Sequence, residues 1–392
     1  MGVGRRLAAL WWLTWDLFTQ RLRHHPILGA AGRAAAAHPL LASPHPHPGA
    51  ATTGSSAGMT VVVTGGNAGV GAATAKRLAA AGAVVVLACR SLERAEAAAE
   101  RINAGLGVAT GGGGNSSRGG DGSTSGGRVT VGPPLDVGDL SSVRRFVSTW
   151  RAEGRGPIGA LICNAGVMAA GRAVPEAHWL VNHLGHFLLT LLLLPELGAD
   201  AGGGAVVVLS SLTALAGVVS PSMATPAVPY NPMAAYAASK LANVLFVRAL
   251  TARLAAGLAT GGGRRATACA PLVVAVHPGD VATSVTRHLP RALQVAKDWL
   301  VTPIFLLDPD AGCRTVVYAA AAAEAVASSA GGAVWGGGGS GGGLGGQLLY
   351  DVNRVWPLAV DDAEVASVWA QSVADVRLSR EEATSIERYL QL

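Results

Sequence analysis

The segment MTVVVTGGNAGVG, residues 59–71, runs from a continuously apolar stretch directly into a cluster of glycines. Gly65, Gly69 and Gly71 form the pattern T-G-x-x-x-G-x-G, which predicts a strand, a tight turn and the start of a helix. The N–H groups and the dipole at such a helix start favour a phosphate. Glycine makes up 53 of 392 residues, so a glycine cluster alone is weak evidence. The prediction rests on the position of the cluster between a predicted strand and a predicted helix. We expect dinucleotide contacts from Thr64, Gly65, Asn67, Gly69, Val70 and Gly71.

The chain after residue 59 alternates between short apolar runs and longer helical stretches. The runs are continuously apolar, as expected for strands buried on both faces. The predicted fold class is therefore α/β, with a Rossmann-like, doubly wound and mostly parallel sheet in one catalytic domain over residues 59–392. Strands are predicted at 59–66, 83–90, 128–137, 159–166, 204–211, 271–279 and 345–351, and helices near 70–82, 91–104, 139–153, 173–198, 233–257 and 309–327.

Three glycine-rich insertions interrupt this pattern, around 105–127, 257–266 and 328–346. Each is predicted where a helix returns to the next strand, at the amino edge of the sheet. Ligands in such folds bind outside the carboxyl edge, so these flexible loops should leave a binding site untouched.

Residues 1–58 form a separate, acid-poor segment that ends in the loop-like run SPHPHPGA. Within it, residues 7–22 place leucines and tryptophans on one helical stripe, too short to span a bilayer. We interpret this stretch as an interfacial helix that seats the protein on a membrane surface of the endoplasmic reticulum or a plastid. A cleaved transit peptide, a secretory signal anchor and a dispensable disordered tail are the alternatives.

Composition excludes several classes of function. The net charge of +6 is scattered, with no basic stripe and interleaved aromatic residues, so nucleic-acid binding is not expected. The cysteines Cys89, Cys163, Cys269 and Cys313 lie far apart, with no spacing typical of a metal site or a disulfide framework. We therefore expect no metal and a soluble domain in a reducing compartment.

Arg90 ends the second predicted strand, at about the distance from the glycine cluster where an adenine ribose is recognised. An acidic residue there would favour the free ribose of NAD, whereas arginine favours the 2′-phosphate of NADP(H). Asp136, followed by Val137, is expected to contact the adenine after the third strand. The alternatives are a solvated charge for Arg90 and a helix cap for Asp136.

Tyr236 and Lys240 stand four residues apart on the predicted helix 233–257, so they share one face. Hydride transfer to or from a carbonyl carbon requires a proton donor and acceptor at the oxygen, but tyrosine is a weak base at its ordinary pKa of about 10. A cation one turn away favours the phenolate and lowers that pKa. The chain has only three lysines among thirty basic residues, and Lys240 can also bond the nicotinamide ribose. Ser211, at a strand end, can donate a hydrogen bond to the substrate oxygen.

These motifs together resemble the short-chain dehydrogenase/reductase family from about Met59 to Trp369, and within it the retinol-dehydrogenase-like branch, which is related to protochlorophyllide reductase. The resemblance rests on the glycine pattern, NAG at 164–166, NHLGHFLLT at 182–190, Ser211 after VVVL, YAASKLANVLF at 236–246, and HPG at 277–279. The N-terminal segment and the three insertions fall outside it.

The resemblance implies further roles. Asn182 would fix a water that continues a proton relay through Lys240, and Ser211 is favoured over Ser210 as the catalytic serine. His183 and His186 are interpreted as packing or hydrogen-bonding residues. Family members are often dimers, so a homodimer is possible. The remaining cofactor contacts implied are Asn164, Ala165 and Gly166 beside the adenosine and ribose, and Pro278, Gly279 and Thr283 at the nicotinamide, with a helix cap as the alternative for Thr283.

The favoured function is an NADP(H)-dependent oxidoreductase that interconverts a carbonyl and an alcohol on an apolar, retinoid-, isoprenoid- or lipid-aldehyde-like substrate. Apolar stretches at 212–230 and 285–307 are the candidate substrate loops. Ring reduction as in protochlorophyllide reductase is less favoured, because residues 212–268 hold no cysteine to donate a proton. The alternative is a membrane-associated module that senses NADP(H) with little turnover.

Overall fold

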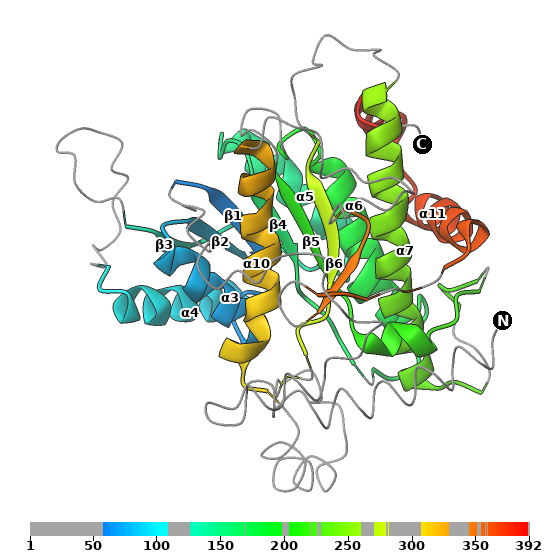
Figure 1. Cartoon of the computed structure of the whole chain (residues 1–392), viewed down its shortest axis with the longest axis horizontal. Coiled ribbons are helices and arrows are strands. Elements are labelled where there is room, and N and C mark those ends of the chain that lie inside the picture. The colour runs from blue at the N-terminus through cyan, green and yellow to red at the C-terminus, as the bar shows by residue number, and fades with distance from the viewer. Residues whose placement is uncertain are drawn as a thin grey trace, which may run out of the picture.

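The computed structural model describes residues 58–108, 126–168, 170–197, 204–220, 222–225, 229–259, 270–279, 281, 307–328, 345–350, 354–356, 358 and 360–390. Within these residues the strands form one eight-stranded sheet in the order β3-β2-β1-β4-β5-β6-β7-β8 (Figure 1). All neighbours pair in parallel except β7 and β8. The strands are β1 (Thr60–Thr64), β2 (Val84–Ala88), β3 (Arg128–Val131), β4 (Ala160–Cys163), β5 (Ala205–Leu209), β6 (Leu272–Val276), β7 (Leu348–Tyr350) and β8 (Arg354–Trp356).

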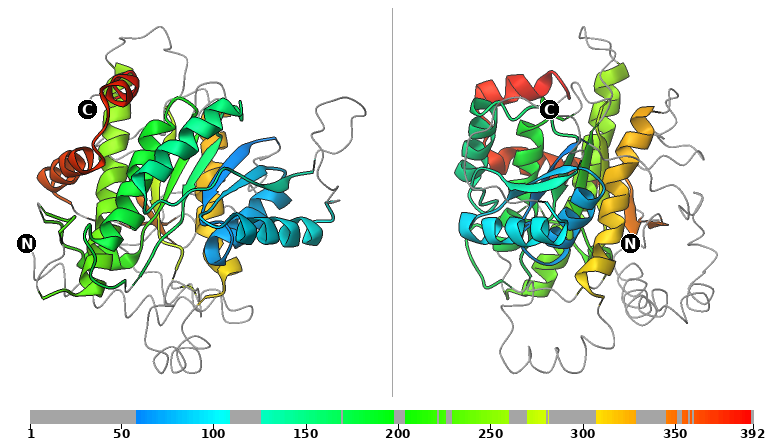
Figure 2. Two further views of the ribbon diagram at one scale, coloured as in Figure 1. Left: turned by 180° about the vertical axis from the view of Figure 1, so that it is seen from behind. Right: turned by 90° about the vertical axis from the view of Figure 1, so that its left-hand side faces the viewer.

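Helices cover both faces of the sheet (Figures 1 and 2). The helices α3 (Gly69–Ala80), α4 (Leu92–Gly105) and α10 (Pro309–Ser328) pack on one face. The opposite face carries α5 (Leu140–Ala152), η2 (Trp179–Leu184), α6 (Gly185–Leu192), η3 (Leu212–Ala216), α7 (Pro232–Ala259), α11 (Asp362–Val376) and α12 (Arg380–Glu387).

The apolar runs of the sequence explain this layering. Successive side chains of a strand point to opposite faces, so a strand covered on both sides must be apolar throughout. In β1, Val62 belongs to one hydrophobic cluster, and Val61 and Val63 belong to the other. All three are fully buried. The predicted doubly wound α/β fold is confirmed.

Seven of the eight strands lie within the ranges predicted from the sequence, with shorter bounds. The prediction missed β8, which pairs antiparallel with β7 at the edge of the sheet and has only three residues. It also missed α11 and α12. The three residues of β8 are too few to leave a clear pattern in the sequence, and α11 and α12 pack against helices that lie far away in the chain, α7 and α6.

The helix predicted at 173–198 is wrong in its bounds and its regularity. Helical structure begins only after Glu176, whose carboxylate accepts the backbone N–H of Trp179 at 2.7 Å. The first part is a π-helix, η2, and the α-helix α6 follows it. Every residue of α6 is buried, so its leucine-rich sequence packs on the sheet as predicted.

The three glycine-rich insertions fall between α4 and β3, between α7 and β6, and between α10 and β7. Each therefore joins the end of a helix to the next strand, as the sequence predicts. Residues 1–57, with the predicted interfacial helix at 7–22, lie outside the described part of the chain. No helix that the structure describes combines the length and apolar character that a bilayer span requires.

Candidate active site

The glycine turn after β1 is held by close backbone packing. Gly65 and Gly69 have φ of +63° and +55°, in the left-handed region that side chains disfavour. A Cβ on Gly71 would lie 2.5 Å from Asn164 Nδ2 and 2.7 Å from the carbonyl oxygen of Gly65. Asn164 Nδ2 donates to the Thr64 carbonyl at 2.8 Å and to the Gly65 carbonyl at 3.3 Å. The turn and the NAG segment therefore form one unit.

The N-terminus of α3 follows this turn, and within the described residues no side chain caps its first backbone N–H groups. Its N-cap residue is Ala68, whose side chain has no oxygen to accept a hydrogen bond. Thr64 is fully buried behind the turn, where its hydroxyl accepts the N–H groups of Asn164 and Ala165 at 2.9 and 3.0 Å. Asn67, in the turn, accepts a weak hydrogen bond from the Cys89 thiol at 3.6 Å. This arrangement suits an anionic ligand.

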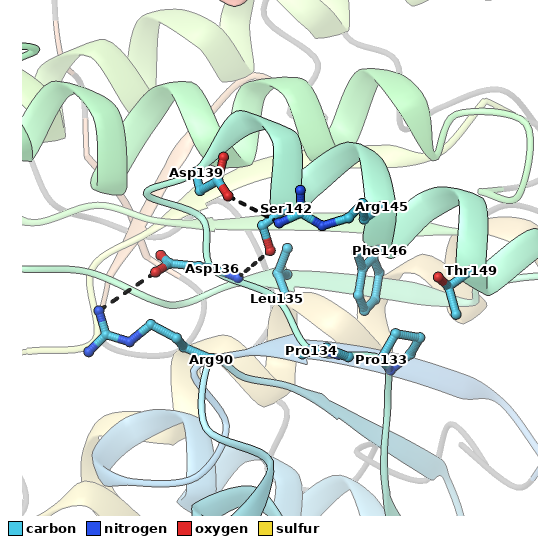
Figure 3. Close-up of a pocket in the computed structure, with 10 residues that line it drawn as sticks. All are labelled: Arg90, Pro133, Pro134, Leu135, Asp136, Asp139, Ser142, Arg145, Phe146 and Thr149. Atoms are coloured by element: carbon cyan, nitrogen blue, oxygen red, sulfur yellow. Dashed lines mark hydrogen bonds and ion pairs between the residues drawn. The ribbon is translucent and has the colours of Figure 1, made fainter.

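A pocket of about 340 Å³ lies beside the carboxyl ends of β2 and β3 (Figure 3). Arg90 Nη1 lies 3.7 Å from Asp136 Oδ2, and the Arg90 side chain is 76% exposed. Asp136 Oδ1 accepts the N–H of Gly138 at 2.9 Å, which orients the carboxylate. On the other side, α5 contributes Ser142, whose hydroxyl accepts the N–H of Asp136 at 3.0 Å. Val137 is buried in the core behind this loop.

Tyr236 and Lys240 lie on the same side of α7, as their spacing predicts. Lys240 Nζ is 5.6 Å from the centre of the Tyr236 ring. The Lys240 ammonium is buried and donates to the Leu209 carbonyl, at the end of β5, at 3.0 Å. Burial lowers the pKa of Lys240 from 10.5 to about 8. The helix therefore carries a phenol and a buried amine next to the end of the sheet.

Asn182 lies in the π-helix η2, and its side chain connects two elements. Its Oδ1 accepts the N–H of Val167 at 2.8 Å, and its Nδ2 donates to the Val167 carbonyl and to Ser239 Oγ, each at 3.0 Å. Ser239 Oγ donates in turn to the Tyr236 carbonyl at 2.7 Å. A Cβ on Gly166 would lie 3.2 Å from Asn182 Oδ1 and 3.9 Å from Lys240 Nζ. Asn182 thus joins the segment after β4 to the helix of Tyr236.

The two serines after β5 have different partners. Ser210 Oγ donates to the Lys240 carbonyl at 2.7 Å, so its proton is already used in a hydrogen bond to α7. Ser211 Oγ accepts the N–H of Thr213 at 3.2 Å and caps η3. In the described part of the chain, no residue accepts the Ser211 hydroxyl proton. The short helix η3 packs on α7, since a Cβ on Gly217 would meet the Ala237 carbonyl at 2.5 Å.

A buried carboxylate cluster that sequence reasoning missed lies beside Tyr236. Glu176 Oε1 accepts hydrogen bonds from His178 Nδ1 at 2.7 Å and from the Tyr230 hydroxyl at 2.8 Å. The rings of His178 and Tyr236 meet edge to face with centres 6.2 Å apart. Burial alone would raise the pKa of Glu176, but the hydrogen bonds from His178, Trp179 and Tyr230 outweigh it and lower that pKa. The cluster ties Tyr230 of the predicted substrate loop to the segment before η2.

The predicted site residues that the structure describes lie at the carboxyl edge of the sheet. Arg90 and Asp136 lie together at one end, and the glycine turn joins Asn164 and Ala165. Pro278 and Gly279 follow β6, with φ of +84° at Gly279. Thr283 lies outside the described residues. The roles of Glu176, His178 and Tyr230 had no signal in the sequence, because nothing local shows that a glutamate is buried.

Comparisons with known proteins agree with this geometry. The sequence model of the family described as short chain dehydrogenase matches residues 59–111 and 123–293. Mouse polyprenol dehydrogenase is 37% identical over 269 residues, which cover 67% of this chain and 71% of the relative. Human retinol dehydrogenase 11 is 34% identical over 266 residues, 67% of this chain and 72% of the relative. A solved structure from Mycobacterium paratuberculosis has a TM-score of 0.54 at 30% identity, covering 83% of this chain and 96% of that one.

The family match spans both the glycine turn and the helix of Tyr236 and Lys240. The two relatives are named as dehydrogenases of polyprenol and of retinol. The chain therefore belongs to the short-chain dehydrogenase/reductase family of oxidoreductases, in its retinol-dehydrogenase-like branch.

Proposed function

We propose that this protein is an NADP(H)-dependent oxidoreductase that interconverts a carbonyl and an alcohol on an apolar, retinoid-, isoprenoid- or lipid-aldehyde-like substrate. The observation that carries the proposal is the buried Lys240 amine 5.6 Å from the Tyr236 ring, on one face of α7. That pair lies at the same sheet edge as the glycine turn.

The residues present fit a nicotinamide dinucleotide. The close packing at Gly65 and Gly71 leaves no space for side chains, which keeps the turn between β1 and α3 tight. A tight glycine turn that leads into a helix N-terminus suits a pyrophosphate. The first N–H groups of α3 would bind its oxygens. Asn164 to Gly166 would border the adenosine and ribose, and Gly279 the nicotinamide. The Lys240 amine lies beside this segment, since a Cβ on Gly166 would be 3.9 Å from Lys240 Nζ.

Arg90 is the reason for preferring NADP(H) over NAD(H). Its largely exposed guanidinium follows β2, and Asp136 holds it near the loop after β3. A guanidinium binds a phosphate through paired, charge-assisted hydrogen bonds. An acidic residue at this position would instead repel a 2′-phosphate.

The bound cofactor supplies or accepts the hydride. In the reduction, Tyr236 donates its hydroxyl proton to the substrate oxygen as negative charge develops there, and in the oxidation it accepts that proton. The Lys240 ammonium favours the phenolate of Tyr236. The Ser211 hydroxyl, whose proton is available, donates a hydrogen bond to the same oxygen. Asn182 bonds to Val167 and to Ser239, and Ser239 bonds to the Tyr236 carbonyl, so Asn182 helps to fix the position of Tyr236. The water relay through Asn182 stays a prediction.

The proposed substrate class rests on the names of relatives and on the composition of the loops. Mouse polyprenol dehydrogenase and human retinol dehydrogenase 11 are named for long apolar alcohols. Residues 212–230, near Tyr236, are mostly apolar. An oily alcohol or aldehyde therefore suits this site better than a sugar.

The test is NADPH consumption by the wild type and by Tyr236→Phe over a panel of retinal, farnesal-like, steroid and short aldehydes. The wild type should turn over apolar members. Tyr236→Phe should bind NADPH with unchanged affinity but lose about 10²- to 10⁴-fold in kcat, the usual contribution of a positioned acid. Undiminished turnover by Tyr236→Phe would remove the assigned acid/base. If the wild type turns over nothing, the NADP(H)-sensing alternative replaces the enzyme.

A further inference from the structure

Helix α11 lies outside the family match, which ends at residue 293, yet it packs directly on the catalytic layer. Trp369 of α11 is buried, with its ring 5.2 Å from that of Phe187 and 6.4 Å from that of Phe246. Arg253 lies over the same indole at 4.1 Å. This apolar contact holds α11 against α6 and α7.

Two hydrogen bonds run from α11 to the π-helix η2. Ser372 Oγ is 2.7 Å from His183 Nε2, and Asp375 Oδ2 accepts the indole N–H of Trp179 at 2.8 Å. Ser372 and His183 are both fully buried. The two residues of η2 involved, Trp179 and His183, flank Asn182.

The bond to His183 continues toward Lys240. Burial lowers the pKa of His183 to about 3, so its ring is neutral and carries one proton. Asn243 Oδ1, 3.1 Å from His183 Nδ1, is an acceptor, so the proton lies on Nδ1 and His183 Nε2 is an acceptor. The single proton of the Ser372 hydroxyl then has two acceptors at 2.7 Å, His183 Nε2 and the Val368 carbonyl one turn earlier in α11. The bond from His183 Nδ1 fixes the amide of Asn243.

Asn243 then connects two backbone carbonyls next to the predicted catalytic residues. Its Nδ2 donates to the Asn182 carbonyl at 3.1 Å and to the Leu209 carbonyl at 3.0 Å. The Leu209 carbonyl also accepts the Lys240 ammonium at 3.0 Å. His186 Nδ1 lies 3.4 Å from the same Asn182 carbonyl, which lies in the π-helix η2. A buried chain of hydrogen bonds thus leads from Ser372 to Lys240.

We propose that His183, Asn243 and Ser372 are positioning residues that let α11 fix Lys240 and the Asn182 carbonyl for proton transfer. The inference rests on the proposed function for its catalytic consequence. A satisfied buried network specifies one arrangement, and the loss of one member leaves the next without its partner. Without the Ser372 hydroxyl, His183 Nε2 loses this partner, so the His183 ring and the Asn243 amide that it contacts are held less firmly against the Asn182 and Leu209 carbonyls.

The experiment compares Ser372→Ala with Ser367→Ala in the full chain. Both substitutions remove a hydroxyl from α11, but Ser367 is exposed and provides the matched control. In Ser372→Ala we expect kcat to fall about 10- to 100-fold, as for a small misplacement of a reacting group. The KM for the carbonyl substrate and the affinity for NADPH should stay within about twofold. Ser367→Ala should behave as the wild type.

A second pair tests the other bond. Asp375→Asn keeps an oxygen that can accept the Trp179 indole proton, so it should retain kcat. Asp375→Leu removes the acceptor and should lower kcat in the same way as Ser372→Ala.

A readout that does not depend on turnover separates this inference from the proposed function. The rate of acetylation of Lys240 by acetic anhydride, followed by peptide mass spectrometry, should rise in Ser372→Ala because the amine is less firmly held. Exposed Lys76 serves as the internal reference. Unchanged Lys240 acetylation, or a joint loss of kcat, NADPH affinity and thermal stability, would overturn the proposal. If the wild type turns over no carbonyl, the proposed function fails and the acetylation result alone decides the inference.

Discussion

Lys240 is a lysine whose amine is buried in the protein. This burial lowers its pKa from 10.5 to about 8, since desolvation disfavours the charged form. Its partner is a neutral backbone carbonyl, that of Leu209. The charge that the proposed mechanism needs is therefore lost at a lower pH than for an ordinary lysine.

This predicts the pH dependence of carbonyl reduction. The ammonium is present below about pH 8 and absent above it, so kcat/KM should fall as the pH rises through about 8. Lys240→Met should have a much lower kcat/KM and lose this descending limb. Lys76→Met, on the exposed face of α3, is the control and should keep the wild-type profile. A descending limb that persists in Lys240→Met would assign it to another group.

Arg90 supports a second prediction at the residue scale. Arg90→Asp should weaken NADPH binding about 10- to 100-fold, as expected for the loss of a charged hydrogen bond worth roughly 1.5–3 kcal/mol. NADH binding should change little. Arg101→Asp, exposed on α4, makes the same charge change away from the pocket and serves as the control. Titration by cofactor fluorescence measures both affinities, and an unchanged NADPH/NADH ratio would contradict the phosphate contact.

At the scale of elements, the turn from β1 into α3 depends on backbone packing. The Gly71 position is closed by Asn164 and by the Gly65 carbonyl. The π-helix η2 depends on long-range partners instead, since Asn243 and Ser239 come from α7 and Ser372 comes from α11. A short sequence pattern reveals the turn between β1 and α3, whereas no local pattern reveals the π-helix η2.

Gly71→Ala tests the turn. The new Cβ would force Asn164 or the Gly65 carbonyl to move, so NADPH affinity should fall at least about 10-fold, in line with the 1–3 kcal/mol cost of overpacking. Gly105→Ala is the matched control, because a Cβ there meets nothing within 4 Å. It should keep full affinity and be slightly more stable, since alanine is favoured over glycine in a helix. Equal NADPH affinity in the two variants would argue against a cofactor site at this turn.

At the scale of the whole molecule, the candidate site and the glycine-rich insertions fall in different kinds of connection between helices and strands. The described site residues lie where the strands end, and each of the three insertions comes, in the order of the chain, between the end of a helix and the start of a strand. Because the entropy of loop closure grows slowly with length, such insertions add little cost to folding. The first strand begins at Thr60, so residues 1–58 precede the sheet in the sequence.

The proposed function of that segment is to bind a membrane surface. The full chain should float with liposomes in a density gradient, and a chain that begins at Met59 should stay at the bottom while keeping its NADPH affinity. The expected difference comes from the apolar stripe of residues 7–22. Equal flotation of the two proteins would exclude an anchor in residues 1–58.

The sequence by itself determined the doubly wound sheet, the glycine turn, and the shared face of Tyr236 and Lys240. Continuous apolar runs, glycines at a strand end and a four-residue spacing are all local patterns. Only the tertiary structure decided which groups surround them. The Glu176, His178 and Tyr230 cluster, the π-helix around Asn182, and the link from Ser372 to Lys240 join segments up to 196 residues apart. Burial and hydrogen-bond partners at that separation arise from packing, so no local pattern predicts them.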